Sequence, residues 1–92
     1  MVVPVLKNYD DNCAEVKRVV VKKEYRGRGI SKNIMKLLEQ YAKNKGFSYL
    51  ILESGTQLVE AQSLYKTMGY NIISNYGQYI DMPESICMKK KL

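Results

Sequence analysis

The residues whose types and spacing most plainly suggest chemistry are Arg26-Gly27-Arg28-Gly29, between a run of valines and a segment with helical periodicity. A strand, a glycine-containing turn and a helix start bind phosphate well, because the first helical turn has unpaired N–H groups and partial positive charge. The glycines let an anion approach those amides, and the arginines add donors that suit phosphate oxygens. The stretch predicts a pyrophosphate cradle, with a solvated turn as the alternative. It is neither a Walker A loop nor a complete dinucleotide-binding loop, since Lys32 stands where a third glycine belongs.

Further motifs follow in order along the chain. They are Leu50-Ile51-Leu52-Glu53-Ser54-Gly55, Glu60-Ala61, Leu64-Tyr65-Lys66-Thr67-Met68-Gly69-Tyr70 and the closing Ser85-Ile86-Cys87-Met88-Lys89-Lys90-Lys91-Leu92. Together with the arginine–glycine stretch, they resemble the GNAT superfamily of acyl-CoA-dependent N-acetyltransferases, whose signature is Arg/Gln-x-x-Gly-x-Gly/Ala after a valine-rich strand. The resemblance covers about residues 14–92, and Ser31 departs from the small residue that ends the signature.

The resemblance implies a site for acetyl-CoA. In the family, the backbone of the valine strand receives the extended pantetheine arm, and one of its N–H groups polarises the thioester carbonyl. The residues thereby implied to bind the cofactor are Val19, Val20, Val21, Arg26, Gly27, Arg28, Gly29, Ile30 and Ser31. From their composition alone, the three valines are equally well explained as core.

Two residues match catalytic positions of the family. Tyr65 matches the general-acid tyrosine of Leu-Tyr-x-x-x-Gly-Tyr/Phe, and a phenol with a pKa of about 10 can protonate a departing thiolate. A tyrosine packed in the core is the alternative. Glu15 matches a glutamate that some members use to accept the amine proton, and its alternative is a solvated glutamate paired with Lys17 or Arg18. Glu53 ranks below both and is more simply structural.

The composition limits the other classes of function. Ninety-two residues, 46% hydrophobic and 26% charged, predict a single small ordered domain over 1–92. The net charge of +6 and the pI of about 9.3 favour an anionic partner. Since the chain has no histidine, Ser-His and Cys-His catalysis are excluded and no metal is expected. Cys13 and Cys87, without a signal segment, predict reduced thiols in a cytoplasmic protein, and no apolar run is long enough for a membrane span.

The elements that would position these residues follow from periodicity. Strands are predicted at 2–6, 14–21, 47–53, 70–74 and 86–92, and helices at 30–44 and 58–68. Gly46 and Gly69 would end the helices, and Ser54-Gly55-Thr56 would break the chain and offer caps. The class is α+β (α/β-like), a mixed sheet with two main helices. Its first and last strand pairs are antiparallel, and the strands before and after the first helix are parallel. Where those parallel strands splay, a slot would open.

The resemblance also implies that something is missing. A complete GNAT domain has further strands and a helical pair before the strand that begins near Ala14, and they build much of the acceptor pocket. Because a shortened sheet exposes an edge and an apolar face, we expect a homodimer or a partner subunit. Residues 75–84, with Tyr76 and Tyr79, are the predicted acceptor-side wall.

The sequence predicts an acetyl-CoA-dependent N-acetyltransferase that acts on an unidentified amine by direct transfer. The alternatives are a non-catalytic acyl-CoA-binding or regulatory module and a small basic nucleic-acid-binding protein. Nucleic acid is disfavoured because, apart from Tyr25, no aromatic residues are interleaved with the basic cluster.

Overall fold

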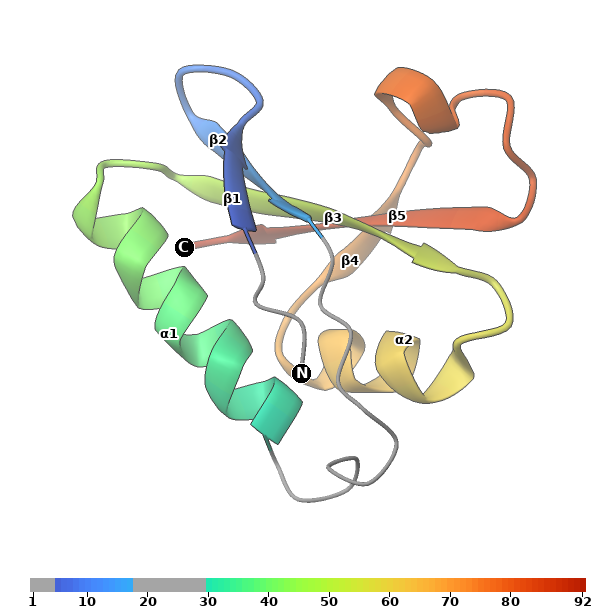
Figure 1. The fold of residues 1–92 in the computed structure, drawn as a ribbon, viewed down its shortest axis with the longest axis horizontal. Helices are drawn as coiled ribbons and strands as arrows, with labels where there is room; N and C mark the ends of the chain where they lie inside the picture. The colour runs from blue at the N-terminus through green and yellow to red at the C-terminus, as the bar shows by residue number, and fades with distance from the viewer. Residues whose placement is uncertain (1–4, 18–29) are drawn as a thin grey trace.

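A computed structural model of the chain describes residues 5–17 and 30–92. The elements in chain order are β1 (Val5–Asn8), β2 (Cys13–Lys17), α1 (Ile30–Asn44), β3 (Tyr49–Gly55), α2 (Val59–Thr67), β4 (Asn71–Ile73), the 3-10 helix η2 (Gly77–Tyr79) and β5 (Ser85–Lys91). They form the predicted α+β architecture, a mixed sheet with two main helices (Figure 1). Within the described part of the chain, neither helix has the length and apolar character needed to cross a membrane.

The described strands form one sheet in the order β1-β2-β3-β5-β4. The strands on either side of α1, β2 and β3, are parallel, and the other neighbours are antiparallel, as the sequence predicts. The last pair between β2 and β3 is Val16 with Leu52, whereas β3 continues beside β5 as far as the pair of Gly55 with Ser85. The C-terminal part of β3 is therefore unpaired on its β2 side among the described residues.

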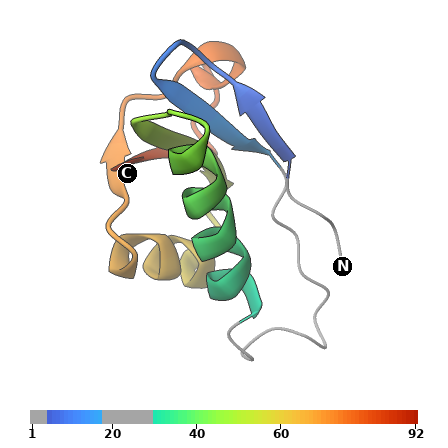
Figure 2. The ribbon, with the colours of Figure 1, turned by 90° about the vertical axis from the view of Figure 1, so that its left-hand side faces the viewer.

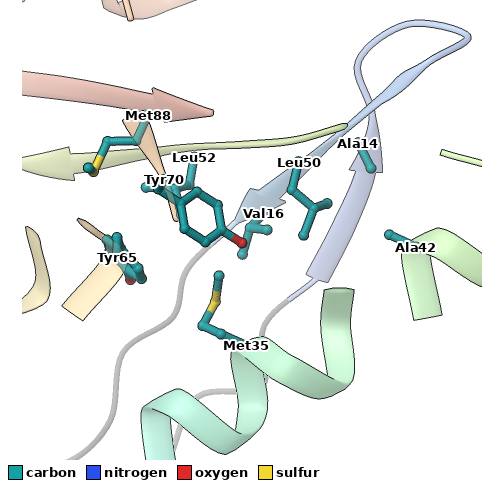
Figure 3. Close-up of a cluster of buried hydrophobic side chains, with 9 residues drawn as sticks. All are labelled: Ala14, Val16, Met35, Ala42, Leu50, Leu52, Tyr65, Tyr70 and Met88. Carbon is teal, nitrogen blue, oxygen red and sulfur yellow. The ribbon is translucent and has the colours of Figure 1, made fainter. Parts of the chain in front are cut away.

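Both helices cover the same face of the sheet. Leu50 and Leu52 alternate along β3 with Ile51 and Glu53, so the two leucines face the helices and the other two residues face away. The apolar cluster on the helix side joins α1 and α2 to three strands (Figure 3); its buried members are Ala14, Val16, Met35, Ala42, Leu50, Leu52, Tyr65, Tyr70 and Met88. Burial of this surface is the main source of stability.

A polar contact also ties α1 to the sheet. The phenol of Tyr70 donates to Oε2 of Glu39 on α1 at 2.9 Å. The ammonium of Lys90 on β5 lies 2.8 Å from the other carboxylate oxygen of Glu39. Glu39 thereby links the first long helix to β5 and to the residue just before β4.

Glycines end both helices, as predicted. Gly46 has a φ of 94° and Gly69 a φ of 99°, in the left-handed region where glycine avoids a Cβ clash. After α1, Gly46 N–H donates to the Lys43 carbonyl and Phe47 N–H to the Ala42 carbonyl. The same pair of bonds follows α2, so each helix ends in a Schellman motif that satisfies its last carbonyls.

Several predicted boundaries are wrong. The strand placed at 2–6 is described as Val5–Asn8: it continues past residue 6 because Lys7 and Asn8 pair with β2, and residues 2–4 lie outside the described residues. The strand placed at 47–53 is Tyr49–Gly55, because Phe47 closes α1 and the end of β3 pairs with β5. The strand placed at 14–21 is described only as Cys13–Lys17, since 18–21 lie outside the described residues.

The predicted cap of the second helix is also wrong. The helix spans Val59–Thr67, its N-cap residue is Leu58, and no side chain caps it. Ser54 and Gly55 belong to β3 instead. The amide of Gln62, inside the helix, reaches back to the carbonyl oxygen of Gly55 at 2.7 Å and steadies the turn that leads into the helix.

Candidate active site at the ends of the parallel strands

The parallel pairing of β2 and β3 is described as far as Val16 with Leu52. β2 runs from the tip of the β1–β2 hairpin towards the end of the molecule that holds α2 (Figure 1, Figure 2). Beyond the last pair, Val16 with Leu52, lies a cavity of about 430 Å³. The sequence predicts a slot between the C-terminal ends of these strands; this cavity lies beyond their last described pair, and the splaying of the strands stays a prediction. Because neighbouring strand residues face opposite sides of a sheet, the cavity has walls from both faces.

The wall on the helix side is mainly apolar; its described residues are Val16, Leu52, Ser54, Leu58, Ala61 and Tyr65. Tyr65 comes from α2, is 8% exposed and meets the ring of Tyr70 edge to face, with 5.8 Å between ring centres. Burial raises the pKa of Tyr65, so its phenol stays protonated at neutral pH and can donate a proton. The structure thus places Tyr65 in the helix-side wall of this cavity.

Ser54 is the polar exception among the strand residues of this wall. Its side chain is buried, and its Oγ has no hydrogen-bond partner among the residues that the structure describes. Neighbouring wall residues such as Leu52 and Ala61 carry no polar side-chain atom. A residue whose buried hydroxyl has no described partner is therefore among those that line the cavity.

The wall on the other side of the sheet is polar; its described residues are Lys17, Glu53, Gly55, Gln78 and Tyr79. The Lys17 ammonium donates to the phenol oxygen of Tyr79 at 3.3 Å. Glu53 accepts a hydrogen bond from the hydroxyl of Ser85 at 2.6 Å, which fixes its carboxylate. A cation, a carboxylate and a phenol therefore meet at this side of the cavity, and Tyr79 comes from the predicted acceptor-side wall.

Glu15 is paired with Lys17, as one alternative has it. It is only 6% exposed, so the expectation that it is solvated is wrong. Its Oε2 accepts a hydrogen bond from the phenol of Tyr76 at 3.0 Å and lies 3.3 Å from the Lys17 ammonium. The described lining of the cavity includes Lys17 but not Glu15. A proton passing from the cavity to Glu15 would therefore need an intermediary.

The charges of this network are held in place by burial and hydrogen bonds. Burial acts to lower the pKa of Lys17, but its bonds to Tyr79 and Glu15 outweigh that effect and raise the pKa above its ordinary value of 10.5. Burial, and then the bond to Glu15, raise the pKa of Tyr76. Lys17 is thus a fixed cation and Tyr76 a fixed neutral donor at neutral pH. The Tyr76 ring also contacts Tyr9 and Tyr79 edge to face, with centres 5.3 and 5.6 Å away.

Most of the predicted cofactor residues cannot be placed. Val19, Val20, Val21, Arg26, Gly27, Arg28 and Gly29 lie outside the described residues. Ile30 and Ser31 begin α1, as predicted, and the first turn of this helix carries no acidic residue that would repel an anion. The pyrophosphate cradle stays a prediction. Over 5–17 and 30–92, no three potential metal ligands among His, Cys, Asp and Glu gather into one group.

Sequence reasoning underrated three residues of the cavity. It considered Lys17 as a partner for Glu15, Glu53 as a third-rank base that is more simply structural, and Ser54 as a possible helix cap. Their signal was strand alternation: the odd-numbered residues of β2 and β3 share the polar face, and Ser54 shares the face of Leu52. The two cysteines are buried, and burial raises the pKa of Cys13 to about 11 and also that of Cys87, so neither is poised as a nucleophile.

The comparison that decides the family covers most of the chain. Residues 3–70 match the model of the acetyltransferase (GNAT) family. The chain belongs to the GNAT acetyltransferase family.

Individual relatives agree with this. YsnE, an uncharacterised N-acetyltransferase of Bacillus subtilis, is 27% identical to this GNAT chain over 89 residues, which are 95% of the chain and 59% of YsnE. A solved structure from Klebsiella pneumoniae, proposed to be an acyl-CoA N-acyltransferase, has a TM-score of 0.89 and 27% identity. Its match covers 97% of the GNAT chain and 61% of the Klebsiella protein.

A second solved structure contains a ligand. The PaiA N-acetyltransferase of Thermoplasma acidophilum, in complex with coenzyme A, has a TM-score of 0.79 and 28% identity, over 95% of the GNAT chain and 50% of that protein. The GNAT chain thus spans half to about three-fifths of the length of these three relatives.

Proposed function

We propose that this chain is an acetyl-CoA-dependent N-acetyltransferase that passes the acetyl group directly to an amine. The cavity between the ends of β2 and β3 carries this proposal, because one wall is apolar and bears a protonated tyrosine while the other is polar and charged. Membership of the GNAT family and the coenzyme A complex of the Thermoplasma relative support it.

The residues present fit such a co-substrate. Acetyl-CoA would supply an acetyl group activated as a thioester. The apolar wall suits an acyl group, and the buried Ser54 hydroxyl offers a hydrogen bond there. The start of α1 at Ile30, on the helix side, would offer its amides to the pyrophosphate. The predicted cradle residues before it would complete the site.

Tyr65 would protonate the departing sulfur. A neutral amine nitrogen would attack the thioester carbon, the carbon–sulfur bond would break, and the sulfur would take the phenolic proton of Tyr65. An acceptor that arrives as an ammonium would first lose one proton to a base, and the attacking nitrogen would then give up a second proton, which restores the phenol of Tyr65. A buried phenol is a sound donor here because its proton is otherwise retained at neutral pH.

The amine would enter from the polar wall. The Glu53 carboxylate lines the cavity directly and can attract the ammonium form of the acceptor. Glu15, the base implied by family resemblance, would receive the proton through water or its Tyr76 and Lys17 partners. The positive charge of Lys17 beside Glu15 compensates the negative charge of that carboxylate until the proton arrives.

The test is release of coenzyme A thiol from acetyl-CoA with a panel of amines, measured on the purified chain. We expect release that depends on both the amine and the protein. Acetyl-CoA binding without amine-dependent release would favour the alternative of a non-catalytic acyl-CoA-binding or regulatory module. The absence of both acetyl-CoA binding and thiol release would overturn the proposal.

A homodimer or a partner subunit is part of the same proposal. Large apolar side chains stand exposed on α1, where Leu37 is 72% and Tyr41 55% exposed. Such surface is a candidate contact for a second copy. A monomer in light scattering at micromolar concentration would count against it.

A further inference from the structure

The Ser54 hydroxyl is the one buried side-chain polar group in the described residues that lacks a hydrogen-bond partner. The residue is 5% exposed and lines the cavity at the ends of β2 and β3. Folded proteins pair nearly all buried polar atoms, because an unpaired one has lost its water without a replacement. A buried, unpaired hydroxyl on a residue that lines a cavity therefore points to a partner that arrives when a ligand fills the cavity.

Ser85, another buried serine of the same sheet, has a hydroxyl with a structural role. Ser85 is 7% exposed and lies on the opposite face, and its hydroxyl donates to the Glu53 carboxylate at 2.6 Å. Gly55 on β3 pairs with Ser85 on β5, so the two serines are close in the sheet. The fold supplies a partner to Ser85 from its own side chains and supplies none to Ser54 among the described residues.

The position of Ser54 identifies the part of a ligand that it would meet. It lies two residues beyond Leu52, the last residue of β3 that pairs with β2, and it shares the helix-side wall with Tyr65. Tyr65 is the group proposed to protonate the thioester sulfur. The atom bonded to that sulfur is the acyl carbon, and its carbonyl oxygen is the strong hydrogen-bond acceptor of a thioester.

We infer that the Ser54 hydroxyl donates a hydrogen bond to the acyl carbonyl oxygen of a bound acyl-CoA. The inference rests on the proposed function. This oxygen becomes more negative as the amine attacks, so the hydrogen bond strengthens along the reaction and favours the transition state. Ser54 would then be a catalytic residue.

The test compares two ligands that differ in one oxygen. Acetyl-CoA and S-ethyl-coenzyme A, a thioether with a methylene in place of the carbonyl, are titrated calorimetrically into the wild-type chain and into Ser54→Ala. We expect Ser54→Ala to weaken acetyl-CoA binding about three- to tenfold and to change S-ethyl-coenzyme A binding by less than about twofold, as for loss of one neutral hydrogen bond. Ser54→Cys, of similar volume but a much weaker donor, should show the same selective loss.

Thermal unfolding supplies a readout independent of the ligand. Removing an unpaired buried hydroxyl should leave the melting temperature of Ser54→Ala unchanged or higher. Ser85→Ala is the matched control: it loses the bond to Glu53, so its melting temperature should fall while its preference for acetyl-CoA over the thioether stays that of the wild type.

Two other outcomes of the titrations would overturn the inference about Ser54. Equal weakening of both ligands would place the hydroxyl against another part of coenzyme A. Unchanged affinity for both would mean that Ser54 binds only water in the cavity. In either case the wild type still binds acetyl-CoA and the proposed function stands. A wild type that binds neither ligand would instead overturn the proposed function itself.

Discussion

The two faces of the sheet contrast in chemistry although the same strands build both. On the helix side, Leu50 and Met88 are fully buried in an apolar cluster. On the other side, a network of hydrogen bonds and one ion pair joins Glu15, Lys17 and the tyrosines of the 75–84 segment. One face is organised for stability, and the other holds charges in fixed positions.

The cavity lies where the two faces meet. Val16 with Leu52 is the last described pair of β2 and β3, and described residues of both faces line the one cavity beyond it. An acyl donor needs an apolar, dry wall, and an amine acceptor needs a polar one. Under the proposed function, the apolar face would therefore serve the acyl donor and the polar face the amine.

The largest expected effect concerns stability. Leu50→Ala on the helix side should lower the free energy of unfolding by about 2–5 kcal/mol, because the side chain is fully buried and leaves a cavity. Ile51→Ala, its neighbour on the polar face, should cost about 2 kcal/mol, since Ile51 is only 3% exposed. Urea denaturation measures both. A cost below about 0.5 kcal/mol for Ile51→Ala, typical of a surface site, would show that the polar face is not packed in solution.

The next effect separates chemistry from binding. Tyr65→Phe removes the proposed proton donor and should lower turnover about a hundredfold, the usual range for loss of a general acid. Acetyl-CoA affinity should change little, because the ring and its packing on Tyr70 remain. Steady-state kinetics and calorimetric titration on the same sample check this. Full turnover in the variant would leave Tyr65 with a packing role only.

A smaller effect concerns the polar face. Tyr76→Phe removes the hydrogen bond to the Glu15 carboxylate and should lower the free energy of unfolding by about 1.5 kcal/mol, as expected for a bond to a charged group. Tyr9→Phe is the matched control, since Tyr9 is 50% exposed and touches the same ring. It should cost less than about 0.5 kcal/mol. Equal costs in urea denaturation would show that the bond to Glu15 contributes nothing.

The smallest effect is a dependence on alkaline pH. Burial raises the pKa of Tyr65, Tyr70 and Tyr76 above 10.0 and that of Cys13 from 9.0 to about 11. The folded chain keeps these protons where the unfolded chain loses them, so stability is intact below about pH 9 and falls as the pH rises further. Each group contributes at most about 1.4 kcal/mol per pH unit. Denaturation at about pH 8 and pH 10.5 should show a shallower fall in Tyr76→Phe; identical slopes would contradict it.

The sequence pattern predicts those parts of the fold that depend on interactions between residues near one another in the chain. The helix at 30–44 has its predicted bounds because its apolar residues recur with helical spacing and Gly46 ends it. The parallel pairing of β2 and β3 follows from the helix between them. The end of β3 was misplaced because Ser54 and Gly55, residues typical of a turn, are held in a strand by pairing with β5.

Less of the candidate site could be predicted from the sequence, because its residues contact one another across long stretches of the chain. Tyr65 is found through its motif, but Glu15 meets Tyr76 across 61 residues of chain, and no local pattern encodes that bond. The role of Ser54 depends on the register of β3 against β2. The cradle at 26–29, the acceptor amine, the oligomeric state and the cytoplasmic location stay predictions.

The most direct measurement is calorimetric titration of acetyl-CoA into the wild-type chain and into a variant whose cavity is filled. Ala61 lines the cavity from α2, whereas Val59 on the same helix is 63% exposed and does not line it. We expect the wild type and Val59→Phe to bind acetyl-CoA, and Ala61→Phe to lose binding while still unfolding cooperatively on heating. Binding of equal strength in all three, or none in the wild type, would contradict the assignment of this cavity to acetyl-CoA.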